Sequence, residues 1–461
     1  MRRALVIGLD SLPALPVLER WGVELPCLRA LAAAGVSGRL RSTDPPITVP
    51  AWASMLTGRD PGVLGLYGFR DRADRSYHRR ALASSDRVGE PWLWERVAAA
   101  GGRALVIGVP PTWPPRVPPG VTLVADFLAP SPEAGYTAPP ELAGEIERVV
   151  GAYALDVEDY RSEEGARVAR ECLAMAERRL SLARHLLVTR PWDLAVVVEI
   201  ATDRLLHALL HHLDPAHPRF VAGSALGALA REVLRRIDRR VGDLVDAAGE
   251  EASVLVVSDH GARPLLGGLR VNEWLRREGW LVLRDAPAAE APFDPARVDW
   301  RRTAAWAEGG YVARIHLNQT GREPEGRLSR AEAERVAAEI AEGLAAVSGP
   351  EGPPLGAEVR CPEELWSAAR GVPPDLMAYL GDLGWRALGG LGPGPLLRDR
   401  NDGGPDSANH DRHGLFVLRE AAGVAAPPAR ELDLLDVAPT LLERLGLPRA
   451  PGLQGAAFAA A

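Results

Sequence analysis

Three largely apolar segments, each about as long as one strand, are each followed within three residues by an aspartate. The segments are residues 3–9, 193–200 and 252–258, and the aspartates that follow them are Asp10, Asp203 and Asp259. Uninterrupted runs of apolar β-formers are typical of strands buried on both faces, as in a parallel sheet covered by helices. In an open α/β sheet the ligand-binding crevice lies at the carboxyl ends of the strands. The sequence therefore predicts an α/β fold in which these carboxylates share one functional edge.

Histidines accompany two of the three aspartates. His260 directly follows Asp259, and His207 lies four positions after Asp203. If the chain is helical after residue 200, Asp203 and His207 share one helix face and can reach one ion. A single aspartate after a strand is more often a helix cap or a turn former. Three such strand ends in one chain favour a metal site.

A proline-rich stretch at residues 41–58 contains a candidate nucleophile, Thr48. Its prolines exclude a central strand and favour a loop that enters a helix at Pro50, with Thr48 just before the helix. The N–H groups and the positive dipole at a helix N-terminus stabilise an anion such as an alkoxide. The alternative is that Thr48 only caps this helix.

The rest of the chain alternates strand-like and helix-like segments, apart from one central region. Helical patterns are expected at residues 16–35, 140–189 and 226–244, and further strands at 103–109, 121–126 and 409–418. This alternation predicts a doubly wound, mostly parallel sheet flanked by helices. Between these segments, prolines and glycines surround a short strand at 311–317 and a helix at 329–347. We expect residues 265–400 to form an inserted subdomain or lid, and residues 1–264 and 401–461 to form the catalytic core.

Composition excludes several classes of protein. The net charge of −7, without a dense basic block, argues against binding to duplex nucleic acid. The three cysteines, Cys27, Cys172 and Cys361, are odd in number and far apart, which argues against a disulfide framework. The first strand begins within three residues of Met1, and no apolar run approaches the roughly 18 residues of a membrane-spanning helix. We therefore expect a cytoplasmic protein without a membrane anchor.

The order of these residues, completed by a late His410-x-x-x-Gly414, resembles that of the alkaline phosphatase superfamily. Within it, the chain is similar to the phosphohydrolase/phosphomutase branch, close to type I phosphodiesterases and nucleotide pyrophosphatases. The motifs that carry the resemblance are PPITVPAW at 45–52, TGRDPG at 57–62, SDHG at 258–261, NEWL at 272–275, GREPEG at 321–326 and DVAPT at 436–440. They extend along nearly the whole chain, and the resemblance implies an alkaline phosphatase-like fold.

The resemblance also implies a metal-dependent phosphohydrolase or phosphodiesterase with two divalent ions. One ion would be held by Asp10, Thr48, Asp259 and His260, and the other by Asp203, His207 and His410. Mixed carboxylate and imidazole ligands suit zinc, with manganese or iron as alternatives. Thr48 would attack phosphorus, and water would then hydrolyse the phospho-threonine intermediate. The position of Gly414 selects His410, and not His413, as the late ligand.

The expected substrate is a small-molecule phosphodiester or pyrophosphate-type ester. Relatives often have Pro-x-x-His-Gly after the nucleophile loop, whereas Leu64 replaces the histidine here and favours an apolar contact with a second ester group. Arg59 and Arg70 are candidate phosphate contacts. A cofactor-independent phosphomutase and a phosphomonoesterase stay open as alternatives. A sulfatase is disfavoured because Thr48 cannot form the required aldehyde, and a binding protein because all seven expected site residues are present.

Overall fold

The computed structural model describes residues 1–285, 287–350, 352–424 and 431–458. The chain divides into two compact units. The first consists of residues 1–69, 83–262 and 410–461, and the second of residues 70–82 and 263–409. The expected insert therefore lies in the second unit. That unit also includes residues 70–82, 263–264 and 401–409, which the sequence analysis had assigned to the core.

The first unit is built on a nine-stranded, mostly parallel sheet. Its strands are Arg3–Leu9 (β1), Val36–Arg41 (β2), Ala104–Ile107 (β5), Val121–Val124 (β6), Thr137–Ala138 (β7), Leu194–Glu199 (β8), Ala252–Val257 (β9), His413–Arg419 (β19) and Leu432–Asp433 (β20). They are arranged in the order β20-β2-β19-β9-β1-β8-β5-β6-β7. The central neighbours β9, β1, β8, β5 and β6 are parallel, whereas β19 and β7 are antiparallel to their partners. The predicted α/β fold is confirmed.

The three strands that lead to aspartates are adjacent in this sheet. All residues of β8 and β9 are buried, as is β1 after Arg3, which explains their largely apolar sequences. In the register of the sheet, Leu9 is opposite Glu199 and Gly8 is opposite Val257. The carboxyl ends of β9, β1 and β8 are therefore level, and the residues that follow them meet at one edge.

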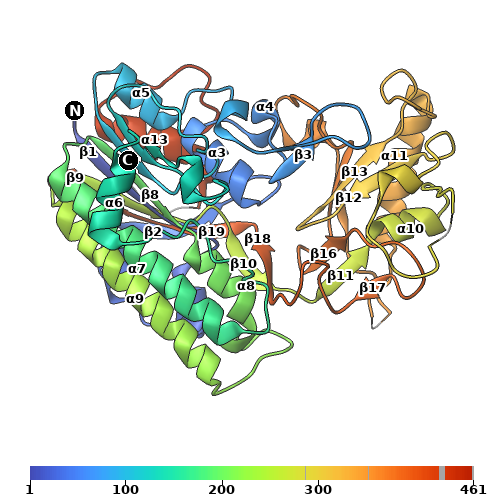
Figure 1. Cartoon of the computed structure of the whole chain (residues 1–461), viewed down its shortest axis with the longest axis horizontal. Helices are drawn as coiled ribbons and strands as arrows, with labels where there is room; N and C mark the ends of the chain where they lie inside the picture. Colours follow the sequence, from blue (N-terminus) through green and yellow to red (C-terminus); the bar gives the residue numbers. More distant parts are fainter. Residues whose placement is uncertain (286, 351, 425–430, 459–461) are drawn as a thin grey trace. The chain divides into compact units, whose positions relative to one another are not determined.

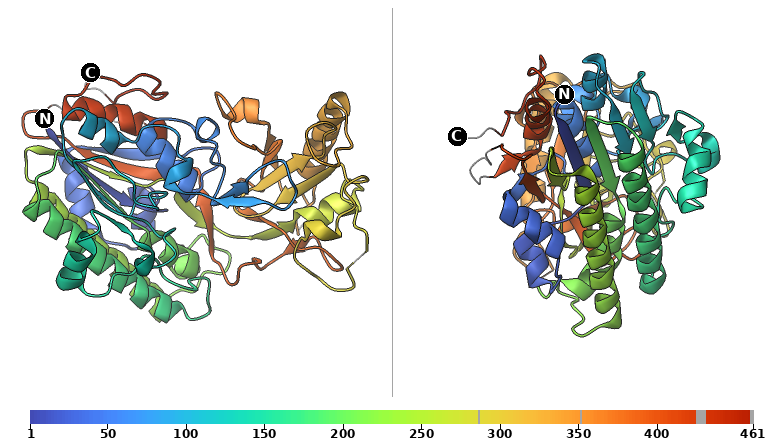
Figure 2. Two further views of the ribbon diagram at one scale, coloured as in Figure 1. Left: turned by 45° about the horizontal axis from the view of Figure 1, so that its top comes forward. Right: turned by 90° about the vertical axis from the view of Figure 1, so that its left-hand side faces the viewer.

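Helices cover both faces of the sheet (Figures 1 and 2). The helices of this unit are Leu15–Arg20 (α1), Pro26–Ala34 (α2), Thr48–Thr57 (α3), Pro61–Leu64 (α4), Leu93–Ala99 (α5), Leu142–Val150 (α6), Gly165–Thr189 (α7), Ala201–Leu213 (α8), Ala225–Ala248 (α9) and Val437–Leu445 (α13). The long helices α7 and α9 pack together on one face with α2, and α5 and α13 lie on the other. Among the described residues, no helix combines the length and apolarity needed to cross a bilayer.

Three predicted elements are divided in the structure. The helical pattern at residues 140–189 forms α6 and α7, with residues 151–164 between them. The helical pattern at residues 16–35 forms α1 and α2, because Gly22 has a positive φ of 68° and Pro26 begins a new helix. The strand predicted at residues 409–418 forms β18 (Ala408–Asp411) and β19, with Arg412 between them. His410 and His413 consequently belong to different strands.

The second unit has its own sheets and its own apolar core. A four-stranded antiparallel sheet has the order β12-β13-β15-β14, and a three-stranded sheet has the order β16-β11-β17. Its elements include Arg70–Arg72 (β3), Arg80–Leu82 (β4), Gly267–Arg270 (β11), Ala305–Glu308 (β12), Ala313–Leu317 (β13), Glu358–Arg360 (β14), Leu376–Tyr379 (β15), Trp385–Leu388 (β16), Leu397–Arg398 (β17), Val271–Arg277 (α10), Arg330–Ala345 (α11) and Pro362–Leu365 (α12). The core comprises residues from α10, α11 and these strands.

Specific contacts attach residues 70–82 to the rest of this unit. The Tyr77 ring stacks on Trp300 with centroids 3.6 Å apart, and its hydroxyl donates to Asn318 Oδ1 over 2.8 Å. The side chains of Arg72 and Glu323 form an ion pair with no exposed surface. Glu323 belongs to the GREPEG motif, so this family motif has a structural role in the second unit.

Candidate active site

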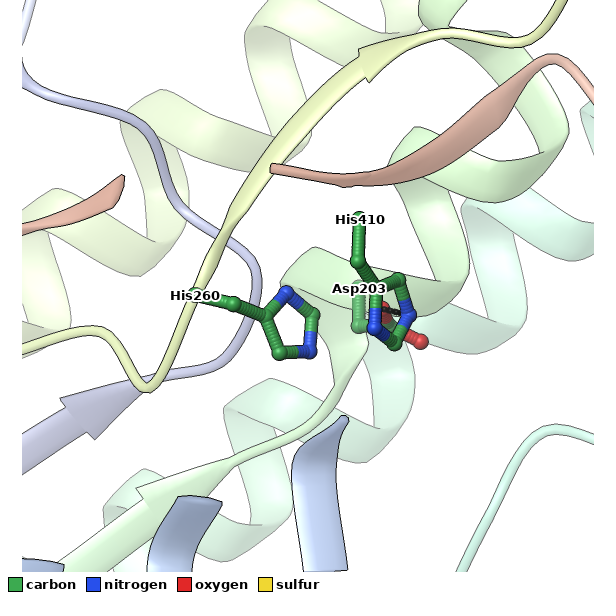
Figure 3. Close-up of side chains that lie close together, drawn as sticks. All are labelled: Asp203, His260 and His410. Atoms are coloured by element: carbon green, nitrogen blue, oxygen red, sulfur yellow. Dashed lines mark ion pairs between the residues drawn. The ribbon is translucent and has the colours of Figure 1, made fainter. Parts of the chain in front are cut away.

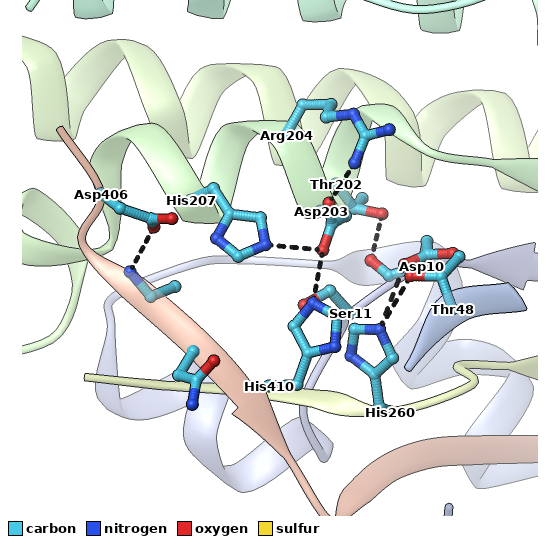
Figure 4. A network of polar contacts seen from close by, with 12 residues as sticks. Asp10, Ser11, Thr48, Thr202, Asp203, Arg204, His207, His260, Asp406 and His410 are labelled. Atoms are coloured by element: carbon cyan, nitrogen blue, oxygen red, sulfur yellow. Dashed lines mark hydrogen bonds and ion pairs between the residues drawn. The ribbon is translucent and has the colours of Figure 1, made fainter. Parts of the chain in front are cut away.

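The three strand-end aspartates lie in one buried cluster, and Figure 4 shows Asp10 and Asp203 within it. Asp10 follows β1 directly, Asp259 follows β9 after one serine, and Asp203 lies in the first turn of α8. The hydroxyl of Thr202 donates to the Asp10 carbonyl over 2.6 Å. This bond fixes the start of α8 against the end of β1, so the carboxylates of neighbouring strands converge.

Thr48 joins this cluster from the first turn of α3. The helix begins at Thr48, two residues before the predicted start at Pro50, and its N-cap is Ile47. Thr48 Oγ1 lies 3.2 Å from His260 Nε2, and the side chain is almost fully buried. Thr48 is therefore not the N-cap of α3, and its hydroxyl contacts the cluster from a position inside the helix.

Backbone carbonyls fix the protonation of two histidines. His260 Nδ1 is 3.0 Å from the Gly261 carbonyl, and His410 Nδ1 is 2.7 Å from the Pro46 carbonyl. A carbonyl only accepts hydrogen bonds, so each Nδ1 donates a proton and Nε2 of the neutral ring keeps its lone pair. In this tautomer an imidazole can bind a metal through Nε2.

Short distances connect the remaining members of the cluster. Asp203 Oδ1 lies 3.3 Å from His207 Nε2 and 3.7 Å from His410 Nε2. The His260 and His410 rings stack with centroids 3.6 Å apart, beside Asp203 (Figure 3). His260 Nε2 is 3.3 Å from Asp259 Oδ2 and 3.7 Å from Asp10 Oδ1. All seven residues expected from the sequence are therefore assembled in one place.

Two overlapping triplets have ligand atoms close enough to share an ion. In the described part of the chain, the ligand atoms of Asp10, Asp259 and His260 lie within 4.8 Å of one another, as do those of Asp203, His260 and His410. His260 is common to both triplets, whereas the sequence analysis had assigned it to one ion only. His207, which was expected to bind the same ion as Asp203 and His410, belongs to neither triplet.

Burial and crowding of charge strongly perturb the carboxylates. Burial raises the pKa of Asp10 well above its usual value, and the charge of Asp203 raises it further. Burial also raises the pKa of Asp259, together with the charge of Asp10. For Asp203 the effect of burial is outweighed by His207 and Arg204, which hold its pKa well below the ordinary value. Three carboxylates in this environment need positive charge nearby.

The same burial keeps the histidines neutral. It lowers the pKa of His260 to about 4, and the pKa of His410 is lowered well below its ordinary value by burial and by the neighbouring His260. Neutral imidazole is the form that binds metals. Both rings can therefore act as ligands at neutral pH.

The donor set fits divalent metal ions. In this cluster, three buried carboxylate oxygens accept no hydrogen bond from the described residues: Asp10 Oδ1, Asp203 Oδ1 and Asp259 Oδ2. A buried carboxylate oxygen without a donor is costly unless a cation is nearby. Mixed oxygen and imidazole ligands match zinc, manganese or iron.

Residues that the sequence analysis did not identify support the predicted ligands. Trp52 Nε1 donates to Asp10 Oδ2 over 2.7 Å, and the backbone N–H of Ser11 donates to Asp259 Oδ1 over 3.3 Å. Ser11 has a positive φ of 64°, which is uncommon for a residue with a side chain. Arg204 Nη1 donates to Asp203 Oδ2 over 2.7 Å. Trp52 ends the PPITVPAW motif, so the motif itself was a usable signal for that residue.

Other sequence candidates have partners elsewhere. Arg59 pairs with Glu90 at 3.1 Å and also donates to the Gly452 carbonyl. Arg70 belongs to the second unit. His413 contacts Arg39 through Nδ1 at 2.6 Å, and its side chain is 23% exposed. Of the two late histidines, His410 is therefore the one that lies in the buried cluster.

Comparisons with known proteins agree with this geometry. The sequence model of the family described as type I phosphodiesterase/nucleotide pyrophosphatase matches residues 4–415. No curated protein sequence matches the chain. Phosphonoacetate hydrolase from Sinorhizobium meliloti 1021, solved with phosphonoformate, has a TM-score of 0.64 at 17% identity, covering 96% of this chain and 95% of its own. Human ectonucleotide pyrophosphatase/phosphodiesterase 5 has a TM-score of 0.57 at 14% identity, covering 98% and 96%. At these identities the structural likeness establishes the fold.

Proposed function

The chain belongs to the type I phosphodiesterase/nucleotide pyrophosphatase family, within the alkaline phosphatase superfamily, and on this premise we propose a two-metal phosphoester hydrolase with Thr48 as nucleophile. The observation that carries the proposal is the convergence of Thr48 with three buried carboxylates and three histidines. Three carboxylate oxygens that accept no hydrogen bond among the described residues support metal binding by the same cluster.

The ligands divide according to their contacts. Asp10, Thr48, Asp259 and His260 are proposed to hold one ion, and Asp203, His207 and His410 the other, with His260 between the two sets. Two divalent ions in such a site lower the pKa of a hydroxyl nucleophile and neutralise charge on the attacking and leaving oxygens. Zinc is the first choice, with manganese or iron as alternatives.

Thr48 is proposed to act through its ionised hydroxyl. The Thr48 Oγ1–phosphorus bond forms as the bond from phosphorus to the leaving ester oxygen breaks, and the leaving group departs with that electron pair. Water then attacks the phospho-threonine, and Thr48 regains its proton as phosphate or a phosphomonoester is released. Return of the phosphoryl group to the substrate would instead make the enzyme a phosphomutase.

Charge balance favours a diester or pyrophosphate-type ester over a simple monoester. Two divalent ions bring four positive charges, and Asp10, Asp203, Asp259 and an ionised Thr48 bring four negative ones. Arg204 adds one positive charge, but its ion pair with Asp156 cancels it. A monoester dianion therefore leaves two uncompensated charges in a buried site, whereas a diester monoanion leaves one.

The decisive experiment compares wild type with Thr48→Ala and Thr48→Ser. We expect elemental analysis to find two ions per wild-type chain and most of this metal in Thr48→Ala, which keeps the other ligands. Turnover should fall by roughly 1,000-fold or more in Thr48→Ala, whereas Thr48→Ser retains a hydroxyl and part of the activity. Near-native turnover by Thr48→Ala would contradict the nucleophile, and one ion or none in the wild type would contradict the two-metal site.

Substrate class is tested with the same metal-loaded protein. We expect a higher kcat/KM for bis-p-nitrophenyl phosphate than for p-nitrophenyl phosphate, and release of free phosphate or phosphomonoester from natural esters. A clear preference for p-nitrophenyl phosphate would favour the phosphomonoesterase. Conversion of a phosphorylated sugar to its isomer without free phosphate would favour the phosphomutase.

A further inference from the structure

Arg204 makes a dense set of contacts immediately beside a proposed metal ligand. Its Nη1 donates to Asp203 Oδ2 over 2.7 Å (Figure 4). Its Nε and Nη2 donate to Asp156 Oδ1 and Oδ2, each over 2.8 Å. The guanidinium carbon also lies 4.4 Å from the centroid of the Tyr160 ring and 5.0 Å from that of Phe127. Only 5% of the side chain is exposed.

These contacts leave Arg204 poorly suited to bind substrate. All three guanidinium nitrogens donate to carboxylates, two of them in a bidentate pair with Asp156. The aromatic contacts further restrict the guanidinium plane. A phosphate clamp needs donors aimed at an incoming oxygen, whereas the donors of Arg204 are aimed at protein acceptors.

The two oxygens of Asp203 have different surroundings. Oδ2 accepts the bond from Arg204, whereas Oδ1 accepts no hydrogen bond from the described residues and lies beside His207 and His410. Rotation of the carboxylate would break the bond to a buried cation, which costs more than a bond between neutral groups. Arg204 thus keeps Asp203 Oδ1 directed at His207 and His410.

We propose that Arg204 is a positioning residue, anchored by Asp156, that presents Asp203 Oδ1 to the metal shared with His207 and His410. This inference rests on the proposed two-metal function and adds a residue that the ligand set does not contain. Partners that orient a metal ligand typically change metal affinity by about 10- to 100-fold when they are removed. The expected defect is therefore weaker metal binding, with little change in substrate affinity.

The test uses the full chain and four proteins: wild type, Arg204→Lys, Asp156→Asn and the control Arg240→Lys. Arg240 is an α9 arginine paired with Glu177 and Asp243, neither of which is a proposed ligand. The Zn²⁺ affinity of each protein is measured by competition with a chromophoric chelator, and folding is checked by circular dichroism. The kcat and KM for bis-p-nitrophenyl phosphate are measured at saturating Zn²⁺.

We expect Arg204→Lys to bind one of its two Zn²⁺ ions about 10- to 100-fold less tightly than wild type, with a largely unchanged KM. Asp156→Asn keeps the arginine and should have a smaller defect in the same direction, which preserves the test if Arg204→Lys does not fold. Arg240→Lys should match wild type.

The possible failures are distinguishable. Absence of Zn²⁺ binding or turnover in the wild type would overturn the proposed function and this inference together. A second outcome is that the wild type binds two Zn²⁺ ions and turns over substrate as proposed. If the Zn²⁺ affinities of Arg204→Lys and Asp156→Asn then lie within twofold of that of Arg240→Lys, the inference alone is overturned. A raised KM in Arg204→Lys at unchanged Zn²⁺ affinity would make Arg204 a substrate contact and would also overturn it.

Discussion

Replacing Trp52 by phenylalanine should damage the metal site without touching a ligand. Trp52 Nε1 donates to Asp10 Oδ2 over 2.7 Å, and Asp10 Oδ1 has no hydrogen-bond donor among the described residues. Trp52→Phe therefore leaves the whole buried carboxylate without a hydrogen bond. A hydrogen bond to a charged group contributes about 1.5 to 3 kcal/mol. Since 1.4 kcal/mol corresponds to about a tenfold change in an equilibrium or rate constant, metal affinity or kcat/KM should fall by roughly 10- to 100-fold.

A second tryptophan provides the matched control. Trp94 is also almost fully buried in the first unit and stacks on Trp92 with ring centroids 4.5 Å apart. Trp94→Phe removes the same atoms and creates a comparable cavity, so both variants should lose stability. We expect only Trp52→Phe to bind Zn²⁺ more weakly in chelator competition and to turn over bis-p-nitrophenyl phosphate more slowly.

Equal metal binding and turnover by the two variants would refute a role of Trp52 in the site. If Trp52→Phe and Trp94→Phe lose similar stability in thermal unfolding but retain equal Zn²⁺ affinity and kcat/KM, the bond to Asp10 contributes nothing to the site. Trp52 would then be a core residue whose indole happens to meet a carboxylate.

Three further outcomes are expected. Gly8→Ala should weaken metal binding as Trp52→Phe does, because an added Cβ would lie 2.3 Å from the Trp52 ring; unchanged Zn²⁺ affinity would contradict this. His410→Ala should lose more metal in elemental analysis than His413→Ala, and the reverse would reassign the late ligand. Burial opposes ionisation of Glu273, but Arg276 and Arg277 lower its pKa to about 2. Glu273→Gln should therefore cost roughly 2 to 3 kcal/mol at pH 7. In denaturant unfolding this deficit should shrink as pH falls from about 4.5 towards 2, and a pH-independent deficit would exclude the ion pairs as its cause.

Most of the fold could be predicted because its signals are local, whereas the full set of seven candidate ligands came from the family resemblance. Apolar runs identify β1, β8 and β9, and the residues after parallel strands must meet at one edge. The supporting contacts are not local. Trp52 reaches Asp10 across 42 positions, and an arginine next to an aspartate in a helix has no distinctive pattern.

The GREPEG and NEWL motifs carried the family resemblance, but their roles depend on tertiary contacts. Asn272 binds both the N–H and the carbonyl of Ala307, and Glu273 accepts the N–H of Gly392. Hydrophobic periodicity contains no information about such pairings. The bounds of the second unit could not be predicted for the same reason, since residues 70–82 belong to it through partners distant in sequence.

The second unit is formed by two segments that are far apart in the sequence, which affects how it can fold during synthesis. Residues 70–82 emerge from the ribosome early, whereas their partners in residues 263–409 emerge much later. Until Trp300 and Glu323 are translated, Tyr77 lacks its stacking partner and Arg72 its counter-ion. The nascent chain must therefore carry this short segment unpaired while most of the first unit is being made. If residues 263–409 were deleted, residues 70–82 would never gain these partners. A shortened protein should therefore also be made without residues 70–82.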